Sequence, residues 1–301
     1  MLYIIAIIFL LIYAAVVRSI YERSVIDVTK INILHELASE KEPVFLYFAD
    51  LHSVSFGKDN KKILDRINAI NPDAIIIGGD MVIKKKKYFF GDNKYKDVSI
   101  NLLNELTAKY PVYYGFGNHE SHLKTNEQTR VEFKNYIYRI ENENMHILTN
   151  SHQYVTYKGT RFCIYGLETC LNYYSKKKVI TPDASYITKC LGESPDHNHS
   201  IPIVISHNPD AFDAVAEWGA EYVLSGHNHG GFVRLPVLGG VIASNYRLFP
   251  KYSAGIYKHK TYSSTMLLTR GLGSHTINFR LFNKPELMVI RFKKKGSSDE
   301  L

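Results

Sequence analysis

Five short segments of this sequence place acids, an amide and histidines directly after apolar runs. The residues are Asp50 with His52, Asp80, Asn118 with His119, His207, and His227 with His229. A single histidine after a strand is more often a hydrogen-bonding residue than a ligand, and an Asp after two glycines is more often a turn residue. The joint occurrence of all five segments instead indicates one site built from carboxylate, imidazole and amide groups.

This set of side chains is suited to hold a pair of divalent cations. Carboxylate, imidazole and amide ligands favour Mn, Fe or Zn over the soft ions that select thiolates. Two cations about 3.5–4 Å apart need a bridging anion, which an Asp can supply. Residues two apart in an extended segment project to the same side, so His227 and His229 can reach neighbouring cations. The pattern therefore predicts a dinuclear metal centre.

The five segments resemble the signature of the calcineurin-like metallophosphoesterases. That signature, D-x-H, G-D, G-N-H-[DE], H and G-H-x-H, corresponds here to DLH, GGD, GNHE, SHNP and GHNHGG. The resemblance covers about residues 44 to 292. The segments HNPDAF, GHNHGGFVRLP and TRGLG are similar to the YaeI/YkuE-like membrane-associated phosphodiesterase branch of the family. The resemblance implies a metal-dependent phosphoric ester hydrolase.

The resemblance also implies a role for each matched residue. Asp50, His52 and His229 would hold the first metal, Asn118, His207 and His227 the second, and Asp80 would bridge the two. A metal-bridging hydroxide would attack phosphorus in line, while the cations neutralise charge on the phosphoryl oxygens. His119 would stabilise the transition state or protonate the leaving oxygen.

We do not expect the other histidines and acids near these motifs to bind metal. Glu120 stands where many family members have Asp, and we expect it to support the metal ligands. We expect His122 to be a surface-loop residue, and His197 and His199 to be exposed in a polar loop.

The elements that must position the site alternate between buried strands and helices. Apolar runs predict strands over 44–49, 74–77, 112–116, 153–157, 161–166, 201–205, 221–224, 232–235, 240–243, 265–269 and 286–292. Helical spacing predicts helices over 61–70, 98–110 and 127–141. Open α/β sheets build sites outside the carboxyl ends of their strands. We therefore expect an α/β four-layer αββα sandwich, with two mixed sheets flanked by helices, over residues 44–292.

The first segment, residues 1–17, is apolar and ends at Arg18. Its length of about 25 Å is just enough to cross a hydrocarbon core. A cleaved signal peptide is the alternative, but no basic residue precedes the run and no clear cleavage site follows it. We expect a transmembrane anchor over 1–21, a linker over 22–43 with helical character at 31–38, and a tail over 293–301. Arg18, Arg23 and Lys30 follow the span, so the positive-inside rule places the catalytic domain in the cytoplasm.

The formal charge of +8 favours anionic partners, although a solvated lysine-rich surface accounts for it equally well. Lys84, Lys85, Lys86 and Lys87 follow the Asp80 motif and either contact anionic lipid or form a solvated loop. Three cysteines without a CxxC pair argue against a disulfide framework and against a cysteine-based zinc site.

Together these features predict hydrolysis of a phosphodiester, phosphomonoester or pyrophosphate bond in a membrane or cell-envelope-related substrate. A metal-dependent protein phosphatase and a nuclease are alternatives within the enzymes, although a nucleic-acid substrate fits the anchor poorly. A non-catalytic membrane-anchored binding module is the alternative from another class. The oligomeric state is left open.

Overall fold

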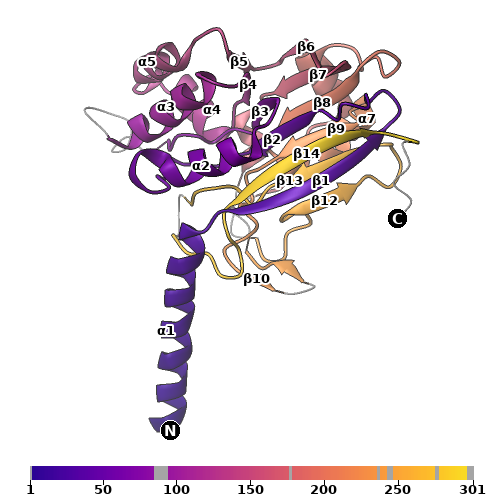
Figure 1. Ribbon diagram of the computed structural model, residues 1–301. Helices are drawn as coiled ribbons and strands as arrows, with labels where there is room; N and C mark the ends of the chain where they lie inside the picture. The colour runs from indigo at the N-terminus through magenta and orange to yellow at the C-terminus, as the bar shows by residue number, and fades with distance from the viewer. Residues whose placement is uncertain are drawn as a thin grey trace.

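Two six-stranded mixed sheets form the centre of the molecule (Figure 1). The computed structural model describes residues 2–84, 94–175, 178–235, 238–242, 247–274 and 278–296. The first sheet has the order β1-β14-β2-β3-β4-β5, with β1 (Asp27–His35), β14 (Glu286–Lys294), β2 (Val44–Phe48), β3 (Ala74–Ile77), β4 (Val112–Gly115) and β5 (Met145–Leu148). The second has the order β12-β13-β9-β8-β7-β6, with β12 (Gly255–Lys258), β13 (Thr265–Leu268), β9 (Tyr222–Ser225), β8 (Ile201–Ser206), β7 (Thr160–Leu167) and β6 (Ser151–Tyr157).

Parallel pairing joins the strands that precede the site motifs. In the first sheet, β2, β3, β4 and β5 run parallel, while β14 is antiparallel to β2. In the second, β7, β8, β9 and β13 run parallel, while β6 and β12 form antiparallel edges. A separate hairpin pairs β10 (Arg234–Leu235) with β11 (Gly239–Gly240). The carboxyl ends of the parallel strands are thus available to build one site.

Helices cover the outer face of each sheet. The helices are α1 (Leu2–Ser24), α2 (Lys61–Ile70), α3 (Lys94–Thr107), α4 (Asn118–Thr125), α5 (Arg130–Ile140), α6 (Ala184–Leu191) and α7 (Phe212–Trp218), with 3₁₀ turns η1 (Lys58–Asn60), η3 (Leu171–Tyr174) and η4 (Pro209–Ala211). One apolar core lies between the first sheet and α2, α3 and α5, and another lies between the second sheet and α6 and α7. A third core fills the space between the sheets. This arrangement confirms the four-layer αββα sandwich.

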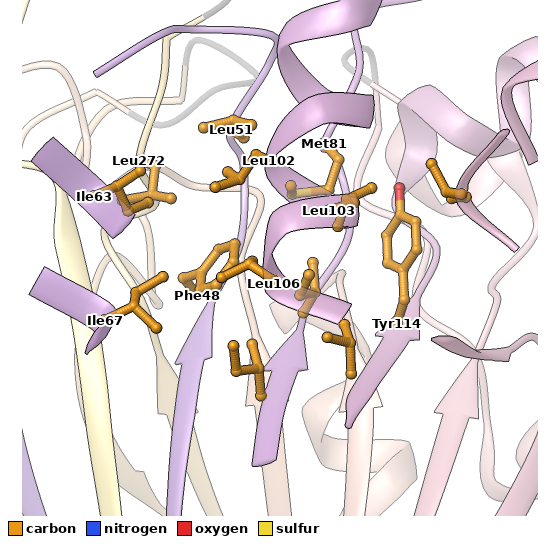
Figure 2. Close-up of a cluster of buried hydrophobic side chains, with 14 of the residues drawn as sticks. Phe48, Leu51, Ile63, Ile67, Met81, Leu102, Leu103, Leu106, Tyr114 and Leu272 are labelled. Atoms are coloured by element: carbon orange, nitrogen blue, oxygen red, sulfur yellow. The ribbon is translucent and has the colours of Figure 1, made fainter. Parts of the chain in front are cut away.

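Strand β2 shows why its sequence is a continuous apolar run. Leu46 and Phe48 belong to the outer core, whereas Phe45 and Tyr47 belong to the core between the sheets. Successive side chains of a strand point to opposite faces, so a strand in a middle layer needs apolar residues at every position. Figure 2 shows Phe48 packed with Leu106 and other residues of the outer core below α3.

The expectation of helical character over 31–38 is wrong. Residues Asp27–His35 form β1, which pairs in parallel with β14 along its whole length. Ile31 and Ile33 are buried while Asn32 and Leu34 are exposed, an alternation with the period of a strand. The segment assigned to a linker therefore contributes an edge strand of the first sheet. Strand β14 also extends through Lys294, two residues into the segment expected to be a tail.

Helix α1 projects away from the sandwich (Figure 1). It is long and apolar enough to cross a membrane, a property that signal sequences near an N-terminus share. Its last turns are bonded to the domain: the Ser19 hydroxyl accepts from the Arg280 backbone N–H at 2.9 Å. The Glu22 carboxylate accepts from the Asn283 backbone N–H at 2.8 Å. These contacts fix where the helix leaves the domain.

Candidate metal centre

The predicted site residues meet at the carboxyl ends of the parallel strands. Asp50 and His52 follow β2, Asp80 follows β3, Asn118 and His119 begin α4 after β4, His207 follows β8, and His227 and His229 follow β9. Ligand atoms in each of three groups lie within 4.8 Å of one another. The groups are Asp50 with His52 and His229, His52 with Asp80 and His119, and Asp80 with His207 and His227. Side chains from both sheets therefore converge on one cluster.

The distances within the cluster are those of ligands around shared cations. The Nε2 atoms of His52 and His229 are 3.1 Å apart. His207 Nε2 lies 3.2 Å from Asp80 Oδ2, and His229 Nε2 lies 3.6 Å from Asp50 Oδ1. Ligand bonds of about 2.0–2.2 Å at tetrahedral or octahedral angles separate neighbouring donor atoms by roughly 2.8–3.6 Å. The spacing thus matches coordination of common ions.

The backbone is strained where these side chains are presented. Asp50, His52, Asp80, His227 and His229 all have positive φ angles, between 49° and 71°. A residue with a side chain in this region costs of the order of 1–3 kcal/mol and persists only where the surrounding fold enforces it. Such strain at five of the predicted ligands indicates that the fold is built to aim them at one point.

Two glycines allow the loops after β3 and β4 to approach each other. Gly79 has a φ of 94°, and a Cβ there would overlap the backbone of Gly117. A Cβ on Gly117 would in turn overlap the Asp80 carboxylate. The close approach brings the His119 backbone N–H within 2.8 Å of Asp80 Oδ1, to which it donates. The GGD and GNH motifs therefore form one rigid unit around Asp80.

Backbone carbonyls set the tautomers of two histidines. His207 Nδ1 lies 2.6 Å from the Gly78 carbonyl oxygen, and His229 Nδ1 lies 3.1 Å from that of Gly273. A carbonyl only accepts, so each Nδ1 must donate. In the neutral ring the lone pair is then on Nε2, which faces the carboxylates. Both rings are thus oriented to coordinate a cation through Nε2.

Asn118 supplies an independent sign that the cluster is a ligand site. Its Oδ1 atom is buried and has no hydrogen-bond partner among the residues that the structure describes. Leaving a buried polar atom unsatisfied costs about 1–3 kcal/mol. A cation would satisfy this oxygen, and the carboxylates and imidazoles of the cluster match the preferences of divalent metals. The residues present therefore fit the metals that the sequence implied.

Charge is balanced across the cluster by carboxylates and imidazoles. Burial raises the pKa of Asp80, but the charged His207 imidazole, whose Nε2 lies 3.2 Å from Oδ2, outweighs that effect and holds the pKa well below its usual range. Burial raises the pKa of Asp50 above its usual range. Burial lowers the pKa of His207, but the Asp80 and Asp50 carboxylates reverse this and raise it to about 10. His207 is therefore protonated at neutral pH in the metal-free protein.

We expect metal affinity to rise with pH, because a cation must displace the proton from His207. The apparent affinity should increase steadily between about pH 7 and pH 9, with proton release on binding. Calorimetric titration of the metal-stripped protein in two buffers of different ionisation enthalpy would count those protons. The protonated ring stabilises the metal-free fold below about pH 6.5, and this contribution is lost as pH rises through about 10. Metal affinity independent of pH in that range would contradict the assignment.

His119 differs from the other histidines in its hydrogen bonds. Its Nδ1 lies 3.0 Å from the Lys84 backbone N–H, which donates to it. The Nδ1 lone pair is therefore occupied, and a neutral ring carries its proton on Nε2. That Nε2 lies 3.9 Å from Asp80 Oδ2. His119 thus presents an N–H donor to the cluster, whereas the Nε2 atoms of His229, and of His207 once a cation displaces its proton, offer lone pairs.

Glu120 ties the Asp80 loop to the start of α4, as expected for a supporting residue. Its carboxylate accepts the backbone N–H groups of Asp80 and Met81 at 2.8 Å each, and that of Gly117 at 3.0 Å. It also accepts the Tyr114 hydroxyl at 2.8 Å. The side chain is fully buried. All of these hydrogen-bond partners are donors, which favours an acid at this position.

We expect Glu120→Gln to destabilise the protein, because its amide NH₂ would face backbone donors. The loss should be about 3 kcal/mol of unfolding free energy, the scale for buried donors without acceptors. Thermal unfolding of the metal-free protein measures it, with the exposed Glu105→Gln as the matched control. Equal unfolding temperatures for the two variants would show that the Glu120 network is not needed.

The structure also tests expectations for residues outside the cluster. His122 lies in α4 and is partly buried, so its expected place in a surface loop is wrong, because α4 begins at Asn118. His197 and His199 are exposed, as expected. All three cysteines are free. Lys84 has an exposed side chain, whereas Lys85, Lys86 and Lys87 lie outside the described residues, and their lipid contact stays a prediction.

Sequence reasoning missed Tyr174, whose ring is 5.0 Å from that of His227. It also missed the carbonyls of Gly78 and Gly273, which orient ligand rings without any side-chain signal.

The amino-acid sequence of this chain is similar to those of known proteins. The family model for calcineurin-like phosphoesterases matches residues 43–231, which is more than half of the chain. The uncharacterized metallophosphoesterase YkuE of Bacillus subtilis is 26% identical over 82% of this chain and 77% of its own. The phosphodiesterase YaeI of Escherichia coli is 26% identical over 86% of each chain. The UDP-2,3-diacylglucosamine pyrophosphatase LpxG of Chlamydia muridarum is 22% identical over 81% of each. The expected resemblance to the YaeI/YkuE-like branch is confirmed.

Proposed function

Because the chain belongs to the calcineurin-like phosphoesterases and is a metal-dependent hydrolase, we propose that it hydrolyses phosphate esters at a dinuclear centre near a membrane. The observation that carries this proposal is the convergence of imidazoles and carboxylates from both sheets in one cluster. Asp50, His52 and His229 would hold one cation, Asn118, His207 and His227 the other, and Asp80 both. Mn, Fe and Zn all suit this donor set.

When bound, two cations would supply Lewis-acid stabilisation of the phosphoryl oxygens and activation of water. The chain's own groups would orient the metal ligands and donate a hydrogen bond to the substrate. The Gly78 and Gly273 carbonyls hold His207 and His229 in the orientation that aims Nε2 inward. The His119 Nε2–H donates a hydrogen bond to a phosphoryl oxygen as negative charge develops on it. In this role His119 is a catalytic residue that acts as a fixed donor.

The substrate class follows from α1 and from the relatives. If α1 anchors the chain, the site works within reach of a bilayer, which favours a lipid or cell-envelope phosphate. LpxG is named for a pyrophosphate bond in a diacylated sugar nucleotide, and YaeI for a phosphodiester. Both names agree with a diester or pyrophosphate in a membrane-related substrate. Arg18, Arg23 and Lys30 follow the apolar run, and by the positive-inside rule they favour the cytoplasmic face for the domain.

The test measures hydrolysis of bis-p-nitrophenyl phosphate and p-nitrophenyl phosphate by the full chain in detergent. The full chain is used because Ser19 and Glu22 of α1 are bonded to the domain. Metal-stripped protein should be inactive and should recover with added Mn, Zn or Fe. A second panel compares a lipid pyrophosphate with soluble nucleotides. No turnover with any metal by folded protein lacking bound metal would favour a binding module, and turnover of nucleotides alone would remove the lipid substrate.

A further inference from the structure

A cavity of about 300 Å³ lies where α1 joins the domain. The last turn of α1 forms one wall, with Ile20 and Arg23, and the loop before α2 forms another, with Phe56. Lys62 of α2 and Arg280 close the remaining sides. The cavity is separate from the metal ligands, none of which lines it. Because the cavity lies beside the candidate membrane helix, molecules at the membrane surface can reach it.

The charged side chains that line the cavity are all positive. Arg23, Lys62 and Arg280 line the cavity, and none of the lining residues that the structure describes is an Asp or Glu. Among the residues that the structure describes, neither Arg23 nor Lys62 forms an ion pair. The buried Arg280 guanidinium donates to the backbone carbonyls of Arg270 and Gly273, at 3.0 and 2.7 Å. The Asp50, Glu286 and Glu22 carboxylates offset part of its charge, but none of them lines the cavity. Three positive charges around one cavity favour an anion.

The local backbone keeps Lys62 beside the cavity. The Lys62 stem packs over Gly57, where an added Cβ would lie 3.3 Å from the lysine Cγ. Gly57 has a φ of 81°, so the turn favours glycine, and the missing side chain leaves room for the stem. The Ser274 hydroxyl, which accepts from Arg280 Nε at 3.3 Å, also lines the cavity and can donate its hydrogen to an anion.

The depth of the cavity matches that of lipid headgroups. Ile20 and Ser24 lie three and seven residues past the apolar run that ends at Val17. At about 1.5 Å per residue they are roughly 5–10 Å beyond the hydrocarbon boundary. The headgroup layer of a bilayer extends about 5–8 Å on each side of the hydrocarbon. Apolar lining from Ile20, Phe56 and Leu272 suits the first carbons below a phosphate.

We propose that this cavity binds the phosphate of an anionic membrane phospholipid. The inference rests on the anchoring role of α1 and is independent of the hydrolytic reaction. Occupancy would seal the junction between helix and domain. It would also hold the metal cluster at a fixed height, because the cavity wall at Gly273 donates its N–H to the Asp50 carbonyl and accepts from His229.

The test counts lipids that the full chain retains in native mass spectrometry. Detergent micelles contain either phosphatidylglycerol or phosphatidylcholine in increasing mole fraction. The wild-type protein should retain phosphatidylglycerol at lower mole fractions than phosphatidylcholine. Arg23→Gln combined with Lys62→Gln should raise the phosphatidylglycerol fraction needed for half-retention about 30-fold, at about fivefold per lost charge. Lys61→Gln is the matched control, because Lys61 is the preceding residue of α2 but pairs with Asp65 at 3.0 Å.

Three outcomes would overturn the proposal. Wild-type protein could retain both lipids equally, the double variant could retain phosphatidylglycerol like the wild type, or millimolar inorganic phosphate could displace the lipid completely. The last result would assign the cavity to free phosphate. Turnover of bis-p-nitrophenyl phosphate is measured on the same samples and should be unchanged in the double variant. Loss of the expected lipid retention would therefore contradict the lipid site alone, whereas absence of turnover would contradict the proposed hydrolysis alone.

Discussion

Asp80→Asn is expected to reduce turnover of bis-p-nitrophenyl phosphate by at least about 10²–10³-fold, the scale of losing one preorganised electrostatic group in an active site. The metal content should fall with it. Asp80 lies close to both parts of the cluster, with Oδ2 at 3.2 Å from His207 Nε2 and at 3.9 Å from His52 Nε2. An amide at this position removes the negative charge that would offset two cations. It also exchanges one acceptor oxygen for a donor.

The measurement pairs kinetics with metal analysis by mass spectrometry on the same protein. Asp65→Asn is the matched control, since Asp65 is an exposed acid of α2 that pairs only with Lys61 in the described part of the chain. Because Asp80 Oδ1 also accepts the His119 backbone N–H, the unfolding temperature of the variant must be checked. Folded Asp80→Asn protein with two metal equivalents and normal turnover would contradict the bridging role.

The sequence predicts the middle of the fold well, for a physical reason. Strands β2, β3, β8 and β9 are buried on both faces, so each is a continuous apolar run that ends at a site residue. Edge strand β1 was missed because one of its faces is exposed. Ile31, Ile33, Leu34 and Ala38 are compatible with either helix or strand in isolation, and pairing with β14 decides between them.

The types of the site residues could also be predicted, but not their protonation. Motif spacing identifies which histidines meet. It does not show that His207 faces the Gly78 carbonyl while His119 faces the Lys84 N–H, because those partners come from other segments. The cavity between α1 and α2 is likewise invisible in the sequence. Arg23, Lys62 and Arg280 lie far apart along the chain and meet only through folding.

Replacement of His119, which presents an N–H donor to the cluster, is the second change for which we expect a large loss of turnover. His119→Ala should lower turnover by about 10²–10³-fold, since it removes one hydrogen bond to developing charge. His119→Gln should keep a substantial part of that activity, because its amide N–H can donate without titrating. A neutral imidazole whose Nδ1 already accepts from Lys84 would become an anion if it gave up its Nε2 proton. Such a ring is a hydrogen-bond donor and a poor general acid.

The pH dependence of kcat separates the two roles that the family resemblance left open. If His119 only donates a hydrogen bond, the wild type and His119→Gln should share one profile shape and differ in height alone. If His119 transfers a proton, the wild type should show a basic limb that the glutamine variant lacks. His122→Gln is the matched control, because His122 is the partly buried histidine one turn along α4. Activity of His119→Gln as low as that of His119→Ala, together with loss of the basic limb, would assign proton transfer to His119 and require Nδ1 to release the Lys84 N–H during turnover.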